Sequence, residues 1–127
     1  MTPQKQSIYD VLIVDDDYAI REMLEEALED SGYRVMSAEN GAQALEQLRQ
    51  TAQLPRIILL DLMMPVMSGW EFRMEQQTDN RLAAIPVIVL SARPSLQHEA
   101  YKMTVDGFIP KPMDITRLLT TVERYCS

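Results

Sequence analysis

The sequence predicts an α/β protein built on a five-stranded parallel sheet with helices on both faces. Strand and helix patterns alternate along the whole chain. The strand candidates "VLIV" and "VIVL" are continuous apolar runs rich in β-branched residues, which is typical of parallel strands buried on both sides. Five successive strand–helix units joined by right-handed crossovers form a parallel sheet, so we expect all five strands to belong to one sheet with helices on both faces.

The first half of the chain contains two predicted strand–helix units. Residues 10–14 form an apolar strand, and the helix that follows ends at Gly32, a common C-terminal glycine. Its apolar stripe has helical spacing and consists of Ile20, Met23, Leu24, Ala27 and Leu28. Residues 34–39 are a short second strand, and residues 40–52 a helix capped by Asn40. The apolar positions of that helix are Leu45, Leu48 and Ala52.

The third unit begins with a strand that ends in an acidic residue. Residues 56–61 are apolar up to Asp61. Residues 62–67 contain a proline and are predicted to form a loop. Ser68 then caps a weaker helix over residues 69–80.

The last two units carry shorter elements. Residues 87–92 follow a proline and form the fourth strand, and residues 93–103 are helical after Pro94 with poor periodicity. Residues 107–112 are the fifth strand. A C-terminal helix has an apolar stripe made of Ile115, Leu118, Leu119, Val122 and Tyr125.

Composition limits the class of protein. The 127 residues fit one domain, and 46% hydrophobic and 24% charged residues are typical of a globular chain. A formal net charge of -7 argues against a nucleic-acid surface. No segment has the length of a membrane span, the N-terminus lacks the apolar core of a signal peptide, and the single Cys126 fits a reducing compartment. We therefore expect a cytoplasmic protein with no nucleic-acid or membrane partner.

Chemically capable side chains stand where the predicted strands end. Asp15 and Asp16 follow the first strand, Asp61 ends the third, Ser91 the fourth and Lys111 the fifth. Ligands of parallel sheets bind beyond the carboxyl ends of the strands, so these residues are expected to converge. Clustered carboxylates need a neutralising cation, and Mg²⁺ prefers oxygen ligands together with a phosphate oxygen. The pattern favours a Mg²⁺-dependent phosphoryl-transfer site.

Other chemistries find little support. Neither cysteine nor histidine stands at a strand end, which disfavours zinc or a nucleophilic thiol. The "DDD" run lacks the spacing of a calcium loop, and no glycine-rich phosphate loop is present, which disfavours ATP binding. Asp17 has two interpretations: the mouth of the site, or the cap of the first helix.

Four segments together resemble the receiver domain of two-component response regulators. They are "VLIVDDDYAIRE", "IILLDLMMPVMSGWE", "IPVIVLSA" and "GFIPKP". The resemblance implies a flavodoxin-like receiver fold with strand order 2-1-3-4-5 over residues 8–127, preceded by a tail of residues 1–7. It is similar to the stand-alone, chemotaxis-regulator type, although a receiver excised from a longer protein has the same pattern.

The resemblance assigns the acidic residues. Asp61 matches the phosphoacceptor, which takes a phosphoryl group from a kinase phosphohistidine. Asp16 matches a direct Mg²⁺ ligand and Asp15 one that acts largely through water. Met63 matches the position whose backbone carbonyl completes the protein ligands of Mg²⁺.

It also assigns the residues around the phosphoryl group. Lys111 matches the family's ammonium group, and Pro112 the proline that follows a cis peptide bond. Ser91 matches the hydroxyl that turns toward the phosphoryl group, and Phe108 the aromatic switch coupled to it, although an aromatic residue in a strand is also normal in a core. Met63 and Arg93 flank the route of an attacking water and are expected to tune the lifetime of the phosphorylated state.

The implied function is a signalling switch rather than an enzyme with turnover, because the domain catalyses only its own phosphorylation and slow dephosphorylation. The implied partners are a histidine kinase or phosphotransfer protein, and a downstream protein or a second copy. The latter would bind the face formed by the fourth helix, fifth strand and fifth helix, roughly residues 94–126. The segment "MTVDG" departs from the family's small-residue turn at Thr104 and Val105, which leaves the length of the fourth helix open.

Two alternatives remain at this point. A haloacid-dehalogenase-like phosphatase would use the D-x-D within residues 15–17, with Ser91 and Lys111 as later motifs, but it leaves Asp61 unexplained. An unphosphorylated receiver-like adaptor would have the same fold, but none of the acidic residues or the lysine is missing here.

Overall fold

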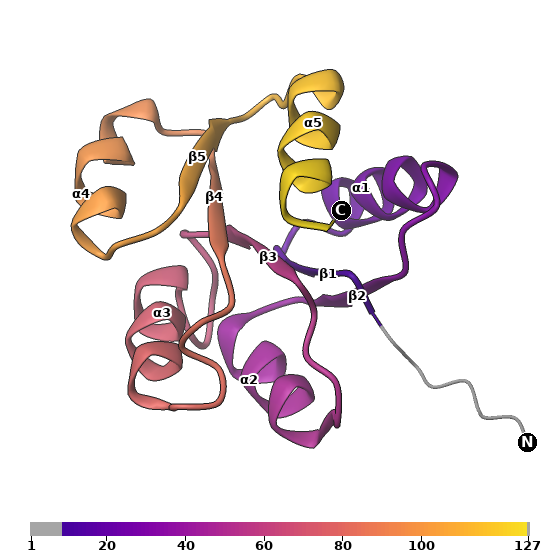
Figure 1. Ribbon diagram of the computed structural model, residues 1–127. Coiled ribbons are helices and arrows are strands. Elements are labelled where there is room, and N and C mark those ends of the chain that lie inside the picture. Colours follow the sequence, from indigo (N-terminus) through magenta and orange to yellow (C-terminus); the bar gives the residue numbers. More distant parts are fainter. Residues whose placement is uncertain (1–8, 127) are drawn as a thin grey trace, which may run out of the picture.

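The computed structural model describes residues 9–126 and contains the predicted parallel sheet (Figure 1). The expected tail of residues 1–7, together with residues 8 and 127, lies outside the described part of the chain. The strand order is β2-β1-β3-β4-β5, as expected from the resemblance. The strands are β1 (Val11–Val14), β2 (Val35–Ala38), β3 (Ile57–Asp61), β4 (Val87–Ser91) and β5 (Gly107–Pro110).

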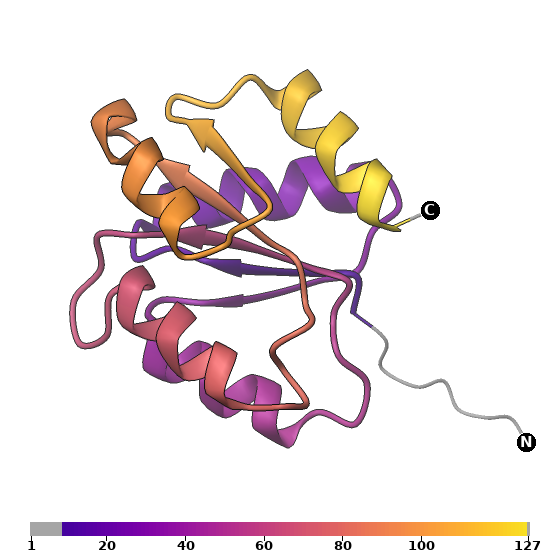
Figure 2. The same ribbon diagram turned by 60° about the vertical axis from the view of Figure 1, so that its left-hand side comes forward.

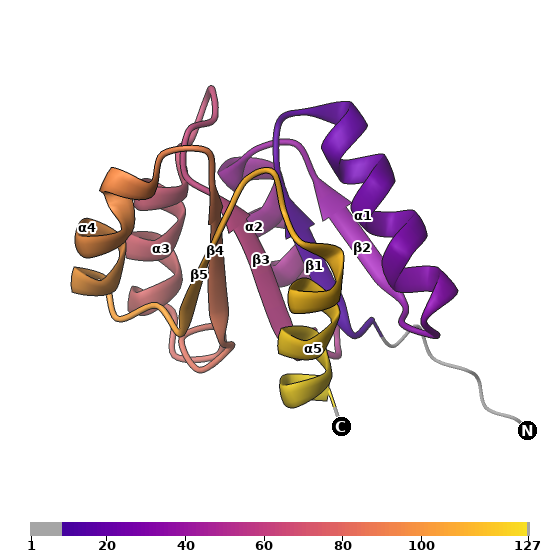
Figure 3. The same ribbon diagram turned by 90° about the horizontal axis from the view of Figure 1, so that it is seen from above.

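Helices cover both faces of the sheet (Figures 2 and 3). The helices are α1 (Tyr18–Asp30), α2 (Gly41–Gln50), α3 (Gly69–Thr78), α4 (Gln97–Lys102), which follows a 3₁₀ turn η1 (Pro94–Leu96), and α5 (Ile115–Cys126). Helices α1 and α5 pack on one face, and α2, α3 and α4 on the other. None of the helices in residues 9–126 is both long and apolar enough to cross a lipid bilayer.

The strands divide their side chains between two apolar cores. In β1, Leu12 and Val14 face α2 and α3, whereas Val11 and Ile13 face α1 and α5. Strands β3 and β4 alternate in the same way. Because side chains alternate across a strand, a sheet covered on both faces needs apolar residues at every position. This requirement explains the uninterrupted apolar runs of the sequence.

The glycine predicted to end the first helix lies just after α1. Gly32 has a φ of 95° just after α1, and its N–H donates to the Glu29 carbonyl at 3.0 Å. The next N–H, that of Tyr33, donates to the Leu28 carbonyl at 3.1 Å. This pair of bonds satisfies carbonyls that a helix end leaves free, and the left-handed residue is one that glycine adopts without strain.

Side-chain caps begin the next two helices. The Asn40 side chain accepts from the Gln43 N–H at 2.9 Å. Ser68 accepts from the Glu71 N–H at 3.2 Å, while Glu71 accepts from the Ser68 N–H at 2.9 Å. These reciprocal bonds form a capping box, which fixes the start of α3 directly after the loop from β3.

Some details of the predicted helices were wrong. Met23 is 41% exposed, because the buried line of α1 runs through Leu24 and Leu28 and leaves Met23 at its edge. Ala52 is exposed beyond the end of α2, and α3 ends at Thr78, two residues earlier than predicted. Helix α4 has only six residues, in agreement with the poor periodicity of its segment.

A buried arginine anchors the turn after α4. Arg73 of α3 is 5% exposed and donates to the carbonyls of Met103 at 3.2 Å and Thr104 at 2.9 Å. Thr104 has a φ of 55°, a conformation in which a β-branched residue is strained. Gln77 also donates to the Thr104 hydroxyl at 2.8 Å. These contacts hold Thr104 in the left-handed region, which a glycine at this position would enter without support.

Arg73 also contacts the buried side-chain amide of Gln76. Arg73 donates to Gln76 Oε1 at 2.7 Å, and Gln76 Nε2 donates to the carbonyls of Leu82 and Ile85. Burial lowers the pKa of Arg73, and the charge of nearby Asp106 opposes that shift. Helix α3 therefore fixes both the loop before β4 and the turn before β5.

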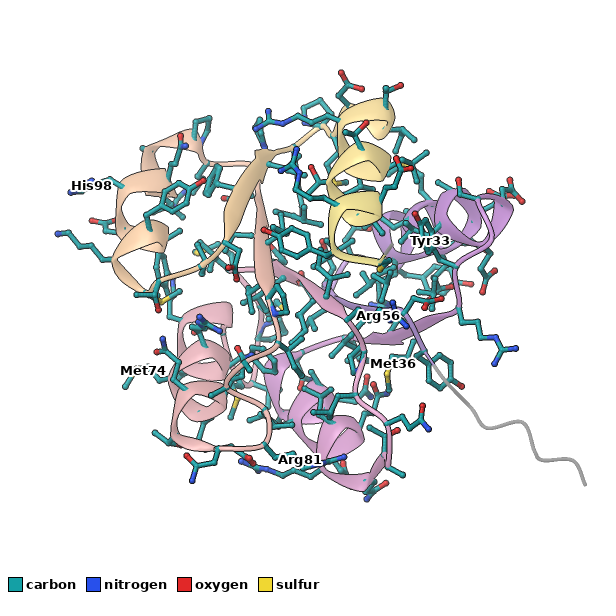
Figure 4. The ribbon with its side chains drawn as sticks, in the orientation of Figure 1. Tyr33, Met36, Arg56, Met74, Arg81 and His98 are labelled. Carbon is teal, nitrogen blue, oxygen red and sulfur yellow. The ribbon has the colours of Figure 1, made fainter. Side chains whose placement is uncertain are left out.

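Arginines also join α2 to its neighbours. Arg81, labelled in Figure 4, reaches α2 from the loop after α3 and donates to the Leu48 carbonyl at 3.0 Å and to the Thr51 carbonyl. It thus satisfies carbonyls at the C-terminal end of α2. Arg49 lies 3.7 Å from both Glu75 and Asp79, and half of its side chain is exposed.

We expect Arg73→Leu to lower the free energy of unfolding by about 2–3 kcal/mol, because it takes the arginine donor away from the buried Gln76 oxygen and from the Thr104 carbonyl. Arg49→Ala removes only exposed ion pairs and should cost less than about 1 kcal/mol. Urea unfolding of the two variants measures the difference. Equal losses would contradict the structural role of Arg73.

Candidate functional site

Three predicted acidic residues come together at the carboxyl ends of the central strands. Asp15 and Asp16 directly follow β1, and Asp61 is the last residue of the neighbouring β3. One carboxylate oxygen from each residue lies within 4.8 Å of the others. Asp15 and Asp61 are buried, whereas Asp16 is exposed. The three residues form an acidic pocket with one side open to solvent.

Lys111 brings its ammonium group into this acidic pocket. It follows β5, and its Nζ lies 2.7 Å from Asp15 Oδ2 and 3.5 Å from Asp61 Oδ1. The peptide bond between Lys111 and Pro112 is cis. The Lys111 side chain is only 12% exposed, so its charge acts on Asp15 and Asp61 with little screening by water. One cation thus contacts two of three clustered carboxylates.

The pKa of Asp61 reflects its burial and the charges around it. Burial, followed by the charge of Asp15, raises the pKa of Asp61 to about 6, and Asp16 acts in the same direction. Lys111 and a hydrogen bond from the Met63 backbone oppose this rise. Burial is thus the main cause of the raised pKa, and Asp15 and Asp16 add to it against Lys111, so a further cation would be stabilised there.

Asp15 is held firmly beneath this pocket. It has no exposed surface, and its Oδ1 accepts from the Asp17 N–H at 2.9 Å. Its backbone carbonyl accepts from the Arg21 guanidinium at 2.7 Å. Arg21 was not predicted as a site residue, because its contact depends on the bend between β1 and α1.

The third aspartate of the run has a different role. The Asp17 side chain accepts from the N–H groups of Ala19 at 2.9 Å and Ile20 at 3.3 Å, so it caps α1. Of the two interpretations of Asp17, the structure supports the cap. The exposed Asp16 is then the one residue of the run whose carboxylate joins the pocket from the solvent side.

Ser91 lies at the end of the strand next to β3, and Phe108 lies in the neighbouring strand β5. Ser91 ends β4 and is buried, and its hydroxyl accepts from the Arg93 N–H at 3.0 Å. The Lys111 N–H donates to the Ser91 carbonyl at 2.8 Å, which ties the two strand ends together. Phe108 is 4% exposed and packs in the core under α4. Arg93 and Met63 are exposed in the loops that follow β4 and β3.

A glycine that was not predicted to matter fixes the backbone of Asp61. A Cβ on Gly69 would collide with the Asp61 carbonyl oxygen and lie 2.8 Å from Leu62 Cα. The Gly69 N–H donates to the Leu62 carbonyl at 2.9 Å. The start of α3 therefore packs directly on the end of β3, and only glycine fits. The "SG" after the loop is the sequence signal that could have indicated this contact.

Comparison with known proteins decides the family. The profile described as "Response regulator receiver domain" matches residues 11–123, which is nearly the whole chain. The chain belongs to the response regulator receiver family. Its acidic pocket is consistent with phosphoacceptor signalling, and a receiver is a signalling module whose partner is a histidine kinase.

Curated relatives of this receiver include regulators from distant bacteria. The DNA-binding transcriptional regulator NtrC of Escherichia coli is 37% identical over 92% of this chain, which corresponds to 24% of NtrC. The response regulator MprA of Mycobacterium ulcerans is 37% identical over 86% of this chain and 46% of MprA. The chain thus spans a quarter to a half of the length of these relatives.

Solved structures have the same receiver fold. The chemotaxis response regulator CheY4 of Vibrio cholerae has a TM-score of 0.82 and 30% identity, over 94% of this chain and 99% of CheY4. The response regulator TrrA of Thermotoga maritima, solved in complex with Mg²⁺ and BeF, has a TM-score of 0.80 and 28% identity over 93% of this chain and 99% of TrrA. The receiver family accounts for Asp61, which the phosphatase interpretation leaves unexplained.

We expect Asp61→Asn to raise the free energy of unfolding at about pH 7.5, in buffer with a chelator, on the order of 1–2 kcal/mol. The pKa of Asp61 in the folded state, about 6, lies above the ordinary value of 3.8. The wild type therefore loses stability as pH rises from about 4 to about 6, and asparagine removes that loss.

The gain should disappear near pH 4, where folded wild-type protein carries a protonated Asp61. Chemical unfolding at both pH values measures it, and Asp30→Asn at the exposed end of α1 controls for the general effect of one charge. A gain of the same size at both pH values would contradict the assigned cause.

Proposed function

We propose that this receiver accepts a phosphoryl group on Asp61. The observation that carries the proposal is the position of the Asp61 carboxylate, within 4.8 Å of the Asp15 and Asp16 oxygens and 3.5 Å from the Lys111 ammonium. A carboxylate beside a cation site and an ammonium has the groups that phosphoryl transfer requires, since catalysis of that reaction is mostly positioning and neutralisation of charge.

The cation of this site is proposed to be Mg²⁺. Asp15, Asp16 and Asp61 would hold it together with the backbone carbonyl of Met63, and all four donors are oxygen atoms, as Mg²⁺ prefers. The raised pKa of Asp61 supports the fit, because the charges of Asp15 and Asp16 add to the effect of burial. When bound, the ion would supply neutralisation of charge on the phosphoryl oxygens. The TrrA structure with Mg²⁺ and BeF supports this choice.

Asp61 and Lys111 have different roles in the proposed phosphoryl transfer. An Asp61 oxygen attacks the phosphorus of a phosphohistidine on the partner, so that an O–P bond forms as the N–P bond breaks and the electron pair returns to the histidine nitrogen. The ionised form of Asp61 is the nucleophile. The Lys111 ammonium stabilises negative charge on a phosphoryl oxygen. Hydrolysis of the acyl phosphate by water then returns Asp61 and releases inorganic phosphate.

Ser91 and Phe108 are proposed to report phosphorylation to the surface. The Ser91 hydroxyl would leave the Arg93 amide and donate to the phosphoryl group, and Phe108 would rearrange with it. The affected face comprises α4, β5 and α5, and a groove there is lined by Tyr101, Arg117 and Arg124. This face would bind a downstream protein or a second copy, and backbone chemical shifts of residues 94–126 should move on phosphorylation. Unchanged shifts there would contradict the proposed switch.

The lifetime of the phosphorylated state is proposed to depend on two exposed residues. Met63, two residues after Asp61, is 53% exposed, and Arg93, two residues after Ser91, is also exposed. A bulky apolar side chain and a long cationic one would crowd the water that attacks the phosphoryl group.

Met63→Asn combined with Arg93→Glu should therefore change the dephosphorylation rate, with an expected acceleration of about 3–10-fold, or about 0.7–1.4 kcal/mol in the barrier. Loss of the phosphorylated mass over time measures the rate. Met23→Asn with Arg34→Glu, two exposed positions outside the pocket, is the matched control. An unaltered rate in the Met63/Arg93 variant would count against this role.

The phosphoacceptor proposal is tested by intact mass after incubation with acetyl phosphate and Mg²⁺. We expect a gain of one phosphoryl group, which is lost in Asp61→Asn and in wild type with a chelator. No gain in the folded wild type would contradict the proposal and leave the adaptor interpretation. Turnover of p-nitrophenyl phosphate without phosphorylated protein would instead favour a phosphatase.

A further inference from the structure

The loop between β3 and α3 presents an apolar side chain to solvent from a strained turn. Val66 has a φ of 69° and is 82% exposed. The Met67 N–H donates to the Pro65 carbonyl at 2.7 Å, which closes a γ-turn around Val66. A γ-turn with positive φ is rare, and a β-branched residue at its centre is more unfavourable still.

The surrounding structure imposes this conformation. The Met67 carbonyl accepts from the Gly41 N–H at 3.1 Å, so the loop is fixed to the start of α2. A Cβ on Gly41 would lie 2.8 Å from Met67 Cγ, so the close approach needs glycine. Strain that is held in place by its surroundings is typical of functional segments. Here it directs Val66 outward rather than into the core.

Val66 belongs to a larger apolar surface between two helices. We define the α2–α3 patch as Ala42, Val66, Met67 and Met74. Met74 is 65% exposed and points away from α3 in Figure 4. Two adjoining hollows, with volumes of about 370 and 210 Å³, meet at Met67. Exposed apolar side chains next to hollows are typical of protein-binding surfaces.

The rim of the α2–α3 patch is acidic. Glu46, Glu71 and Glu75 line the two hollows. Among the described residues that line them, Arg49 is the one cation, and it lies 3.7 Å from Glu75. The rim therefore presents net negative charge around an apolar centre.

We propose that the α2–α3 patch binds a basic amphipathic helix of a partner protein. Aliphatic or aromatic side chains of that helix would cover Val66, Met67 and Met74, and its lysines or arginines would face Glu46 and Glu71. Helices commonly bind in grooves between two helices by such an apolar ridge. A second copy is disfavoured because two acidic rims would face each other.

This surface is separate from the α4–β5–α5 face and reaches the phosphorylation site through one loop. The β3–α3 loop directly follows Asp61 and contains Val66 and Met67. A partner bound to the α2–α3 patch would therefore contact the same loop that carries the Met63 carbonyl. The inference concerns the unphosphorylated protein and does not rest on the role of Asp61.

The test uses a synthetic helical peptide of about 18 residues, with leucine along one face and lysine along the flanks. Its binding is followed by the methyl resonances of the nine methionines. We expect shifts at Met67 and Met74 but not at Met23 of α1. A peptide with glutamate in place of lysine should not bind, because its charge repels the rim.

Three variants should each weaken this binding at least about fivefold: Val66→Asn, Met74→Glu and Glu46→Lys. Asparagine tolerates positive φ, so Val66→Asn removes the apolar side chain without disturbing the turn. The matched control is Met23→Glu, an exposed methionine on the opposite face of the sheet, and it should leave binding unchanged.

Three results would overturn the proposal. One is the absence of shifts at Met67 and Met74, and another is equal weakening by Met23→Glu, which would indicate only general attraction to an acidic protein. The third is a concentration-dependent shift of Met74 without peptide, which would indicate a second copy as the occupant.

Discussion

The ion pair between Lys111 and the buried Asp15 is the interaction on which the site depends. A carboxylate without exposed surface needs a cation, and the 2.7 Å contact supplies it. The same ammonium lies 3.5 Å from Asp61, so it ties the ends of β1, β3 and β5 to one point. Burial and the charge of Asp15 still raise the pKa of Asp61 to about 6 against this ammonium, and three carboxylate oxygens within 4.8 Å of one another could hold a metal ion.

The sheet order gives this arrangement its geometry. Strands β1 and β3 are neighbours at the centre, so Asp15 and Asp61 follow adjacent strands. Gly69 then allows α3 to begin against the Asp61 backbone, and the loop between them carries Met63. The strands divide their apolar side chains between two cores, and this packing holds the strand ends in place. The position of the polar residues therefore follows from the packing of the apolar ones.

Much of this was predictable from sequence because it depends on local patterns and topology. Apolar runs that end in Asp61 or Ser91 predicted both the strands and the convergence of their ends, and the caps at Asn40 and Ser68 depend on residues three apart. Asp17 could not be decided, because an acidic residue suits both a helix cap and an acidic pocket until the helix start is known.

The remainder depends on contacts between distant segments. Arg73 would be expected at the surface, yet it is buried because two carbonyls of the turn after α4 accept from it. Thr104 and Val66 occupy left-handed conformations that their side chains disfavour, and nothing local indicates the contacts that hold them. Met23 has the spacing of the apolar stripe of α1, but it lies at the edge of that stripe. It is therefore exposed, whereas Leu24 and Leu28 are buried.

The charge balance of the pocket is tested most directly by NMR titration of the Asp61 carboxyl carbon in chelator buffer, in wild type and in Lys111→Met. We expect a pKa near 6 in wild type and a higher value in the variant, because the ammonium that opposes the shift is removed. Addition of Mg²⁺ to the wild type should lower the pKa, since a bound cation favours the ionised carboxylate. An Asp61 pKa near 3.8, or one that Lys111→Met leaves unchanged, would contradict the central role of this interaction.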